Sequence, residues 1–296
     1  MRHATSKSVF SLCSAALFSV GILLSQAHAG LTLYGSAFSS DPFDNNLSNL
    51  YNVNPTSGAA TLIGNIGYRL VGGLDFDSNG TLYGVGETYT PGSPPFSGPL
   101  VLITINTATG AGSTVGNLGV SKNFQDISFR NSDGKLYAYA SGELYTINKA
   151  SGAAALVGTT GEVEIGGALS FSPTDTLLKI GFDHIFTLDQ SAGNGTASVQ
   201  LSYPTAGTPF ATGSDFDYAT NTLYAAVHTG DSLYSPTYLA TIDTSTGTVT
   251  KIGDSVIGLT GLAAIPEPST YGVLAGLVLV GIGFVNVSRR KKVISA

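Results

Sequence analysis

The chain has 296 residues, of which 43% are hydrophobic and only 11% are charged. Between Gly30 and Ala264, seven Lys or Arg stand against eighteen Asp or Glu, a net charge of −11 that opposes binding to nucleic acid or anionic lipid by this region. The single Cys13 lies in the N-terminal segment, so the sequence after it offers no disulfide, thiolate nucleophile or zinc-thiolate site.

Residues 1–29 have the features of a cleavable secretion signal. Arg2 and Lys7 form a positive start, Val9 to Leu24 is an apolar run, and Ala27-His28-Ala29 is a small-x-small cleavage site. We therefore expect Gly30 to be the first mature residue. An uncleaved signal anchor is the alternative, although the apolar run is shorter than the roughly 20 residues that span a bilayer.

Residues 30–265 contain a repeated turn phrase. An Asn or Asp side chain can accept hydrogen bonds from the backbone two residues on, and a Gly can adopt the positive φ that closes a hairpin of this length. Each copy follows a strand-like phrase such as LYNV or LITI, and most copies precede a short strand that ends in Gly. The five copies are NPTSG (54–58), NTATG (106–110), NKASG (148–152), DQSAG (189–193) and DTSTG (243–247).

A second pattern pairs an inner strand with a Leu-Tyr strand, as in GGLDF with LYGV and QDISF with LYAY. The first Leu-Tyr strand, Leu33 to Gly35, has no inner strand before it, whereas Gly258 to Ala264 stands unpaired at the end. Together they complete five sets of four strands. The pattern resembles a generic β-propeller repeat domain and predicts an all-β, five-bladed β-propeller closed by its C-terminal strand. A linear β-solenoid or a pair of sandwiches is the alternative.

Residues able to perform catalysis or bind a metal are few. His184 and His228 lie in different repeats, and no nucleophile elbow, phosphate loop or HExxH motif occurs, so we expect no catalytic residues and no cofactor. Asp75 and Asp77 begin a phrase, DFDSNG, that matches half of a calcium loop but lacks its final carboxylate. Asp75 and Asp215 occupy equivalent inner-strand positions, which makes these three aspartates weak candidates for a metal site in a chain otherwise expected to hold none.

Loop length marks a candidate binding surface. The connections Tyr34 to Leu50, Tyr83 to Leu102 and Tyr224 to Leu239 span sixteen, nineteen and fifteen positions, whereas two other repeats need only seven. In a closed ring the three long loops belong to neighbouring blades, where aromatic rings beside carboxylates suit sugars. A solvated spacer is the alternative. The predicted binding residues are Phe38, Asp41, Phe43, Asp44, Glu87, Tyr89, Phe96, Asp231 and Tyr234.

Residues 266–296 form a tail with three parts. The tail begins with the tripeptide Pro266-Glu267-Pro268. The apolar stretch 271–287 after it covers about 26 Å as a helix, slightly short of the roughly 30 Å hydrocarbon core, so we expect a minimal transmembrane helix. The basic cluster that follows keeps the C-terminus in the cytoplasm and the domain outside. The motif residues are Pro266, Glu267 and Pro268, and the basic residues are Arg289, Arg290, Lys291 and Lys292.

This tail resembles the PEP-CTERM sorting signal of exopolysaccharide-producing Gram-negative bacteria. The resemblance covers about the last thirty residues and implies export across the inner membrane, anchoring there by the C-terminal helix, and processing by an exosortase-like enzyme. The mature protein would then reside at the cell surface or in the extracellular matrix. A stiff Pro-Glu-Pro linker before an ordinary anchor is the alternative.

The sequence thus divides into a signal peptide (1–29), a propeller domain (30–265) and a sorting tail (266–296). We expect a non-enzymatic propeller that binds extracellular polysaccharide or protein. Two alternatives remain: a secreted propeller hydrolase or lyase acting on extracellular polymer, and a purely structural surface-layer component. The enzyme requires Asp75, Asp215 and either histidine to meet within about 4 to 6 Å.

Overall fold

The computed structural model describes residues 30–38, 46–161, 167–230, 232 and 234–265. The chain separates into two compact units, Met1–Gly30 and Leu31–Ala296, and all described residues except Gly30 belong to the second. The regular elements within these ranges are all β-strands. None of the described segments is a helix with the length and apolar character needed to cross a membrane. The predicted signal peptide and sorting tail lie outside the described residues.

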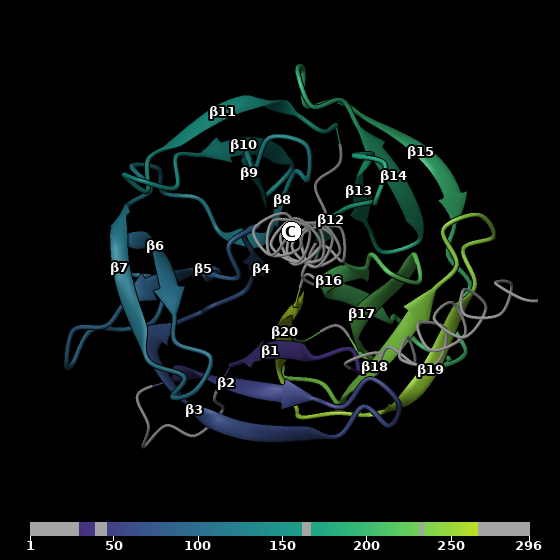
Figure 1. Ribbon diagram of the computed structural model, residues 1–296, viewed down its shortest axis with the longest axis horizontal. Helices are drawn as coiled ribbons and strands as arrows, with labels where there is room; N and C mark the ends of the chain where they lie inside the picture. Colours follow the sequence, from purple (N-terminus) through teal and green to yellow (C-terminus); the bar gives the residue numbers. More distant parts are fainter. Residues whose placement is uncertain (1–29, 39–45, 162–166, 231, 233, 266–296) are drawn as a thin grey trace, which may run out of the picture. The chain divides into compact units, whose positions relative to one another are not determined.

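The strands pair into antiparallel sheets that follow one another in chain order around a centre (Figure 1). The first sheet contains β20 (Leu259–Ala264), β1 (Leu33–Ala37), β2 (Leu47–Val53) and β3 (Ala60–Arg69). The second contains β4 (Leu74–Phe76), β5 (Leu82–Thr88), β6 (Leu100–Ile105) and β7 (Gly112–Asn117). The third contains β8 (Phe124–Phe129), β9 (Leu136–Ala140), β10 (Glu143–Ile147) and β11 (Ala154–Thr159). The fourth contains β12 (Ala168–Phe171), β13 (Leu177–Ile180), β14 (His184–Leu188) and β15 (Gly195–Gln200). The fifth contains β16 (Phe210–Asp217), β17 (Thr222–His228), β18 (Thr237–Ile242) and β19 (Val249–Asp254).

The innermost strands connect the sheets to one another. β4 contacts β8, β8 contacts β12, β12 contacts β16, β16 contacts β20, and β20 contacts β4. The last strand also pairs with the first, since Leu33 lies opposite Ala264 and Gly35 lies opposite Leu262. The first two groups of four strands form one eight-stranded sheet through a short pairing of β3 with β5, in which Arg69 lies opposite Glu87. The arrangement is propeller-like: all-β, with four-stranded antiparallel sheets around a centre.

The repeated turn phrase closes the hairpin between the third and fourth strand of each sheet. In the first copy, Asn54 Oδ1 accepts hydrogen bonds from the backbone N–H of Thr56 (2.9 Å) and Ser57 (3.1 Å). Gly58 has a φ of +76° and donates its N–H to the Asn54 carbonyl at 2.8 Å. The same side-chain hydrogen bonds recur in the other four copies, which confirms the role predicted for the Asn or Asp.

The glycine of each turn packs against the outer strand of the preceding sheet, around the whole series. Its approach is so close that a Cβ on the turn glycine would overlap that strand's backbone. The second copy makes this clear, since a Cβ on Gly110 would lie 2.7 Å from both the carbonyl carbon and the oxygen of Gly64. The glycine pairs are Gly110 with Gly64, Gly152 with Gly116, Gly193 with Gly158 and Gly58 with Gly253. The last pair joins the first and fifth sheets.

The Leu-Tyr strands and the inner strands that end in Phe meet in the core between sheets. In three of the four Leu-Tyr strands, the Tyr packs edge-on against the Phe of the next sheet's innermost strand, the favourable geometry for two aromatic rings. The pairs are Tyr34 with Phe76 (5.6 Å between centroids), Tyr83 with Phe129 (5.4 Å) and Tyr137 with Phe171 (5.3 Å). Both sequence patterns therefore encode contacts between neighbouring sheets.

Candidate functional site

Two faces of the molecule differ in their connections. One carries the repeated turn phrases. The other, called here the loop face, carries the β1–β2, β5–β6 and β17–β18 loops. Because β16, β20 and β4 contact one another in sequence, these three loops extend from neighbouring sheets. Of the predicted binding residues, Phe38, Glu87, Tyr89, Phe96 and Tyr234 are described, whereas Asp41, Phe43, Asp44 and Asp231 lie outside the described residues.

The structure corrects the prediction that Glu87 is displayed among the binding residues, because its side chain is buried. Its carboxylate accepts three backbone N–H groups of the β5–β6 loop: Phe96 at 2.8 Å, Ser97 at 2.9 Å and Gly98 at 2.6 Å. Such bonds to a charged acceptor are stronger than neutral ones. Glu87 therefore fixes the shape of the loop.

Arg69 holds the same loop from the neighbouring strand. Its guanidinium lies 4.5 Å from the centroid of the Tyr89 ring and donates to the Ser93 carbonyl at 3.0 Å. Tyr89 is thus partly buried against a cation, which removes one face of its ring from ligand contact. The Pro-rich β5–β6 loop is consequently ordered by two buried charged side chains, against the alternative of a solvated spacer.

Phe96 is the residue that this ordered loop presents. Its side chain is 70% exposed, and its backbone has a φ of +64°, a conformation that costs a bulky residue energy. The ring stands at a cleft of about 650 Å³ between the β5–β6 loop and the β7–β8 connection. Polar side chains of that connection, Asn117, Ser121, Lys122 and Asn123, line the cleft.

Two further exposed apolar side chains lie on the loop face. Tyr234, in the β17–β18 loop, is 49% exposed, and Ile257, between β19 and β20, is 52% exposed. Phe38 begins the β1–β2 loop and donates its N–H to the carbonyl of Gly258 at 3.0 Å. Gly258 follows Ile257 in the sequence, so the β1–β2 loop begins next to the segment that carries Ile257. The sequence prediction missed Ile257, because a single Ile in a short connection carries no repeated signal.

The aspartates considered for a metal are instead connectors between innermost strands. Asp75 Oδ2 accepts the N–H of Phe129 at 2.6 Å, and Asp215 Oδ2 accepts the N–H of Ala264 at 2.7 Å. Ser128, at the equivalent position of β8, accepts the N–H of Phe171 at 3.0 Å. Each residue thus bonds the next sheet. Within the described ranges no group of three or more His, Cys, Asp or Glu is arranged to hold a metal ion.

Burial changes the ionisation of these carboxyl groups. It raises the pKa of Asp75 to about 7, and it raises the pKa of Asp126 and Asp215 well above the ordinary value. Asp126, which the sequence prediction overlooked, accepts the N–H of Leu169 in the fourth sheet at 2.8 Å. Each of these three carboxyl groups already accepts at least two backbone N–H groups, which leaves it poorly placed to ligate a hard cation.

Asp77 and His228 also have structural partners. Although burial acts to raise it, the pKa of Asp77 is lowered by the N–H of Thr81 and by Lys149, whose Nζ lies 3.2 Å from Oδ2. His228 is buried, which lowers its pKa, and its Nε2 lies 2.9 Å from the Leu259 carbonyl. Asp215 lies opposite Tyr224, four residues from His228 and so about 13 Å away along the strand. These two groups do not form one catalytic pair.

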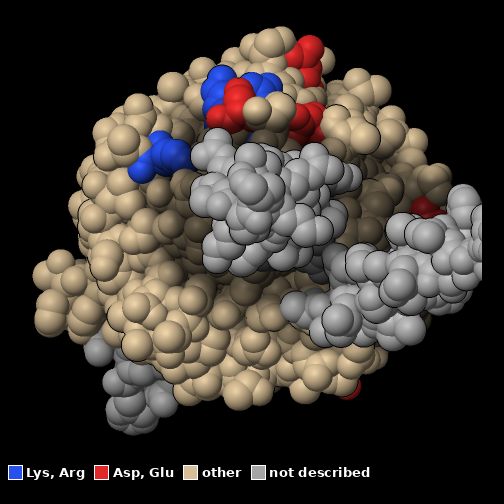
Figure 2. Space-filling model, viewed as in Figure 1, with Lys and Arg blue, Asp and Glu red and all other residues tan. Residues whose placement is uncertain are grey.

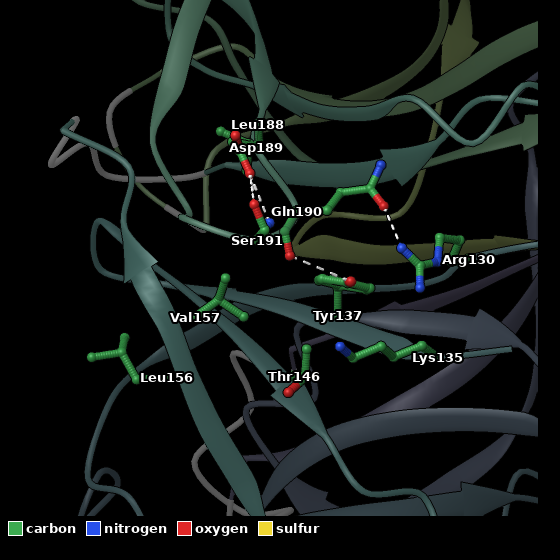
Figure 3. A pocket seen from close by; sticks show the side chains of 10 residues that line it. All are labelled: Arg130, Lys135, Tyr137, Thr146, Leu156, Val157, Leu188, Asp189, Gln190 and Ser191. Carbon is green, nitrogen blue, oxygen red and sulfur yellow. Dashed lines mark hydrogen bonds between the residues drawn. The ribbon is translucent and has the colours of Figure 1, made fainter. Parts of the chain in front are cut away.

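A groove between the third and fourth sheets was not predicted. It has a volume of about 740 Å³ and is lined by Arg130 and Lys135 of the β8–β9 turn and by Gln190 of the fourth turn phrase. Figure 3 shows these side chains around Tyr137. Charged atoms in Figure 2 gather mainly in the sector of these two sheets, and most of the remaining visible face carries neither sign.

Comparison with known proteins supports the fold and no particular activity. No protein family and no curated protein matches the sequence. A chain in the crystal structure of a nidogen/laminin complex is similar in structure, with a TM-score of 0.50 and 11% identity, covering 80% of this chain and 98% of that chain. In total, 377 chains of solved structures match, and so common a fold hosts many unrelated functions.

Proposed function

We propose that the described residues form a five-bladed β-propeller, closed by the pairing of β20 with β1, which acts without catalysis as an extracellular binding protein. Its loop face binds polysaccharide. The proposal depends chiefly on one observation: Glu87 is buried and uses its carboxylate to hold three consecutive N–H groups of a surface loop that exposes Phe96.

The chemistry of the cleft favours a sugar. An exposed aromatic ring can stack on the apolar face of a pyranose, and amide and hydroxyl side chains can bond its hydroxyl groups. Phe96 supplies the ring, and Asn117, Ser121 and Asn123 supply the polar groups. The preformed loop lowers the entropy lost on binding. Tyr234 and Ile257 extend the same surface toward the fifth sheet.

A hydrolase or lyase is less well supported. Asp75 and Asp215 are engaged by backbone N–H groups, and His228 is buried against a carbonyl group. A general acid or base must reach the proton that it transfers. Neither the carboxyl groups nor this histidine offers such access in the described residues.

The binding proposal is tested with the Phe96→Ala variant. In affinity electrophoresis through gels containing neutral or acidic polysaccharides, we expect the wild-type protein to be retarded by at least one polymer. Phe96→Ala should lose most of that retardation, because it removes the aromatic ring on which the sugar would stack. Leu62→Ala, which removes an exposed apolar side chain from an outer strand, is the control. Equal losses for both variants, or no retardation by any polymer, would instead favour the surface-layer component.

The location of the protein is proposed from the tail. Its Pro266-Glu267-Pro268 motif, apolar stretch and basic cluster support export across the inner membrane of a Gram-negative bacterium, temporary anchoring by the C-terminal helix and removal of the tail by an exosortase-like enzyme. Mass spectrometry of the protein from cells with and without that enzyme tests this. Retention of residues beyond 268 in both strains would contradict it.

A further inference from the structure

The groove between the third and fourth sheets departs from the other repeats at one position. The residue before each Leu-Tyr or equivalent strand is Thr in four repeats, and it is Lys135 in the third. The Thr residues are Thr32, Thr81, Thr176 and Thr222. Because Thr occupies this position in four repeats, the fold does not require a lysine there.

A second cation lies beside it. The residue after the Phe of the innermost strand is Arg130 in the third repeat, whereas Asp77, Ser172 and Asp217 occupy that position in the second, fourth and fifth. Arg130 and Lys135 both lie near the ring of Tyr137, at 5.6 Å and 5.3 Å from its centroid (Figure 3). The third repeat is therefore alone among the repeats in carrying two cations at these positions.

Several hydrogen-bond acceptors in the groove are already occupied. Asp189 Oδ1 accepts the N–H and the hydroxyl of Ser191, at 2.7 and 2.6 Å. Gln190 Oε1 accepts Arg130 Nη1 at 2.7 Å, and the Gln190 carbonyl accepts the Tyr137 hydroxyl at 3.5 Å.

Several donors are available by contrast. A guanidinium has five N–H groups, and Arg130 uses three of them on Gln190 and Asp133. Lys135 is exposed and makes no ion pair within the described ranges, and its ammonium group lies 5.3 Å from the centroid of the Tyr137 ring. A groove with unused charged donors and occupied acceptors suits a ligand rich in negatively charged oxygen atoms.

We propose that this groove binds the carboxylate or sulfate groups of an acidic polysaccharide, with Lys135 as the principal contact and Arg130 beside it. The groove volume is within the range of ligand sites. The negative charge of the ligand is inferred from the groove alone, whereas the choice of a polysaccharide rests on the proposed function.

The groove and the Phe96 cleft lie on opposite faces. Arg130 follows the last residue of β8 and Gln190 belongs to a turn phrase, so both are at the strand ends remote from the loop face. A protein with one polymer site on each face can bridge two polymer chains, and linked sites raise overall avidity. The further function would be cross-linking of an extracellular matrix.

The test uses the full chain purified in mild detergent and three variants at equal concentration. Lys135→Thr installs the residue that the other repeats carry, and Lys135→Arg retains the charge. Lys251→Thr is the matched control, because it removes one positive charge from an outer strand where Lys251 pairs with Asp254 at 2.6 Å. The gels contain polygalacturonate, poly-glutamate or dextran, and thermal unfolding checks that each variant is folded.

We expect polygalacturonate to retard the wild type, Lys135→Arg and Lys251→Thr alike at about 50 mM salt and much less at about 300 mM, because screening weakens exposed charge contacts. Lys135→Thr should bind polygalacturonate about three- to fivefold more weakly. Retardation by dextran should be the same in all four proteins. In a protein that carries Phe96→Ala, Lys135→Thr should still weaken the binding of polygalacturonate. This result separates the inference from the proposed function, which depends on Phe96.

Equal weakening by Lys135→Thr and Lys251→Thr would overturn the assignment, because only net charge would then matter. Retardation by poly-glutamate equal to that by polygalacturonate would overturn the polysaccharide class. Absence of retardation by polygalacturonate at low salt would overturn the site itself.

Discussion

The contact between each turn glycine and the preceding sheet can be tested by a single methyl group. Gly110→Ala faces two costs. Gly110 has a φ of +81°, which costs an alanine about 1 kcal/mol. The new Cβ would also lie 2.7 Å from the carbonyl carbon of Gly64, whereas carbon atoms in contact need about 3.5 Å, so the backbone must move by about 0.8 Å. Overpacking of this kind costs about 1 to 3 kcal/mol.

We therefore expect Gly110→Ala to lower the free energy of unfolding by about 2 to 4 kcal/mol. Gly80→Ala separates the two costs, because Gly80 has nearly the same φ, +78°, and no atom within 4 Å of the added Cβ. It should lose only about 1 kcal/mol. Gly64→Ala, which has no positive φ but meets the Thr109 carbonyl oxygen, should be destabilised by packing alone.

Urea unfolding followed by circular dichroism measures all three variants against the wild type. The decisive quantity is the difference between Gly110→Ala and Gly80→Ala, which we expect to be about 1 to 3 kcal/mol. If the two variants agree within about 0.5 kcal/mol, the glycine serves only the turn, and its contact with the neighbouring sheet does not contribute to stability.

Three other predictions concern buried carboxyl groups. Burial raises the pKa of Asp75 from an ordinary 3.8 to about 7, so between these pH values the folded state holds a proton that the unfolded state has lost. The free energy of unfolding should be highest near pH 4 and fall toward pH 7, by about 4 kcal/mol from this group, and Asp75→Asn should flatten the profile measured in urea. Glu87→Gln removes an acceptor from the β5–β6 loop, so chymotrypsin should cleave after Phe96 faster than in the wild type; an unchanged cleavage rate would mean that Glu87 does not order the loop. Asp215→Ala leaves the N–H of Ala264 without its acceptor, and amide exchange of Ala264 should accelerate at least tenfold, about 1.4 kcal/mol, while equal exchange would show that Asp215 does not hold β20.

The propeller-like arrangement was predictable because the same contact is encoded in every repeat. The turn phrase ends in Gly, and the strand after it ends in Gly in most copies, since these glycines meet between sheets. The Leu-Tyr strands and the inner strands that end in Phe recur because Tyr83 and Phe129 pack together, as do Tyr34 and Phe76. A contact repeated between successive sheets leaves a periodic sequence signal.

The site was only partly predictable, because its residues are not repeated. Loop length correctly indicated Phe96 and Tyr234 as exposed aromatic residues. Glu87 was misjudged, since a glutamate at a strand end is normally solvated, and only the structure shows the three N–H groups that turn toward it. Lys135 was overlooked although the repeats carry its signal: it replaces a Thr that recurs four times.

The burial of Arg69 and Glu87 argues for function at the β5–β6 loop. Burying a charged side chain is costly, and replacing buried ionic groups by apolar ones is often neutral or stabilising. Neighbouring sheets are joined by glycine contacts, by aromatic pairs and by buried carboxyl groups of the innermost strands, and none of these contacts uses the β5–β6 loop. Both side chains act instead on a loop that lies outside the sheets. What they preserve is the shape of that loop and the exposure of Phe96, and stability of the ring gives no reason to preserve either.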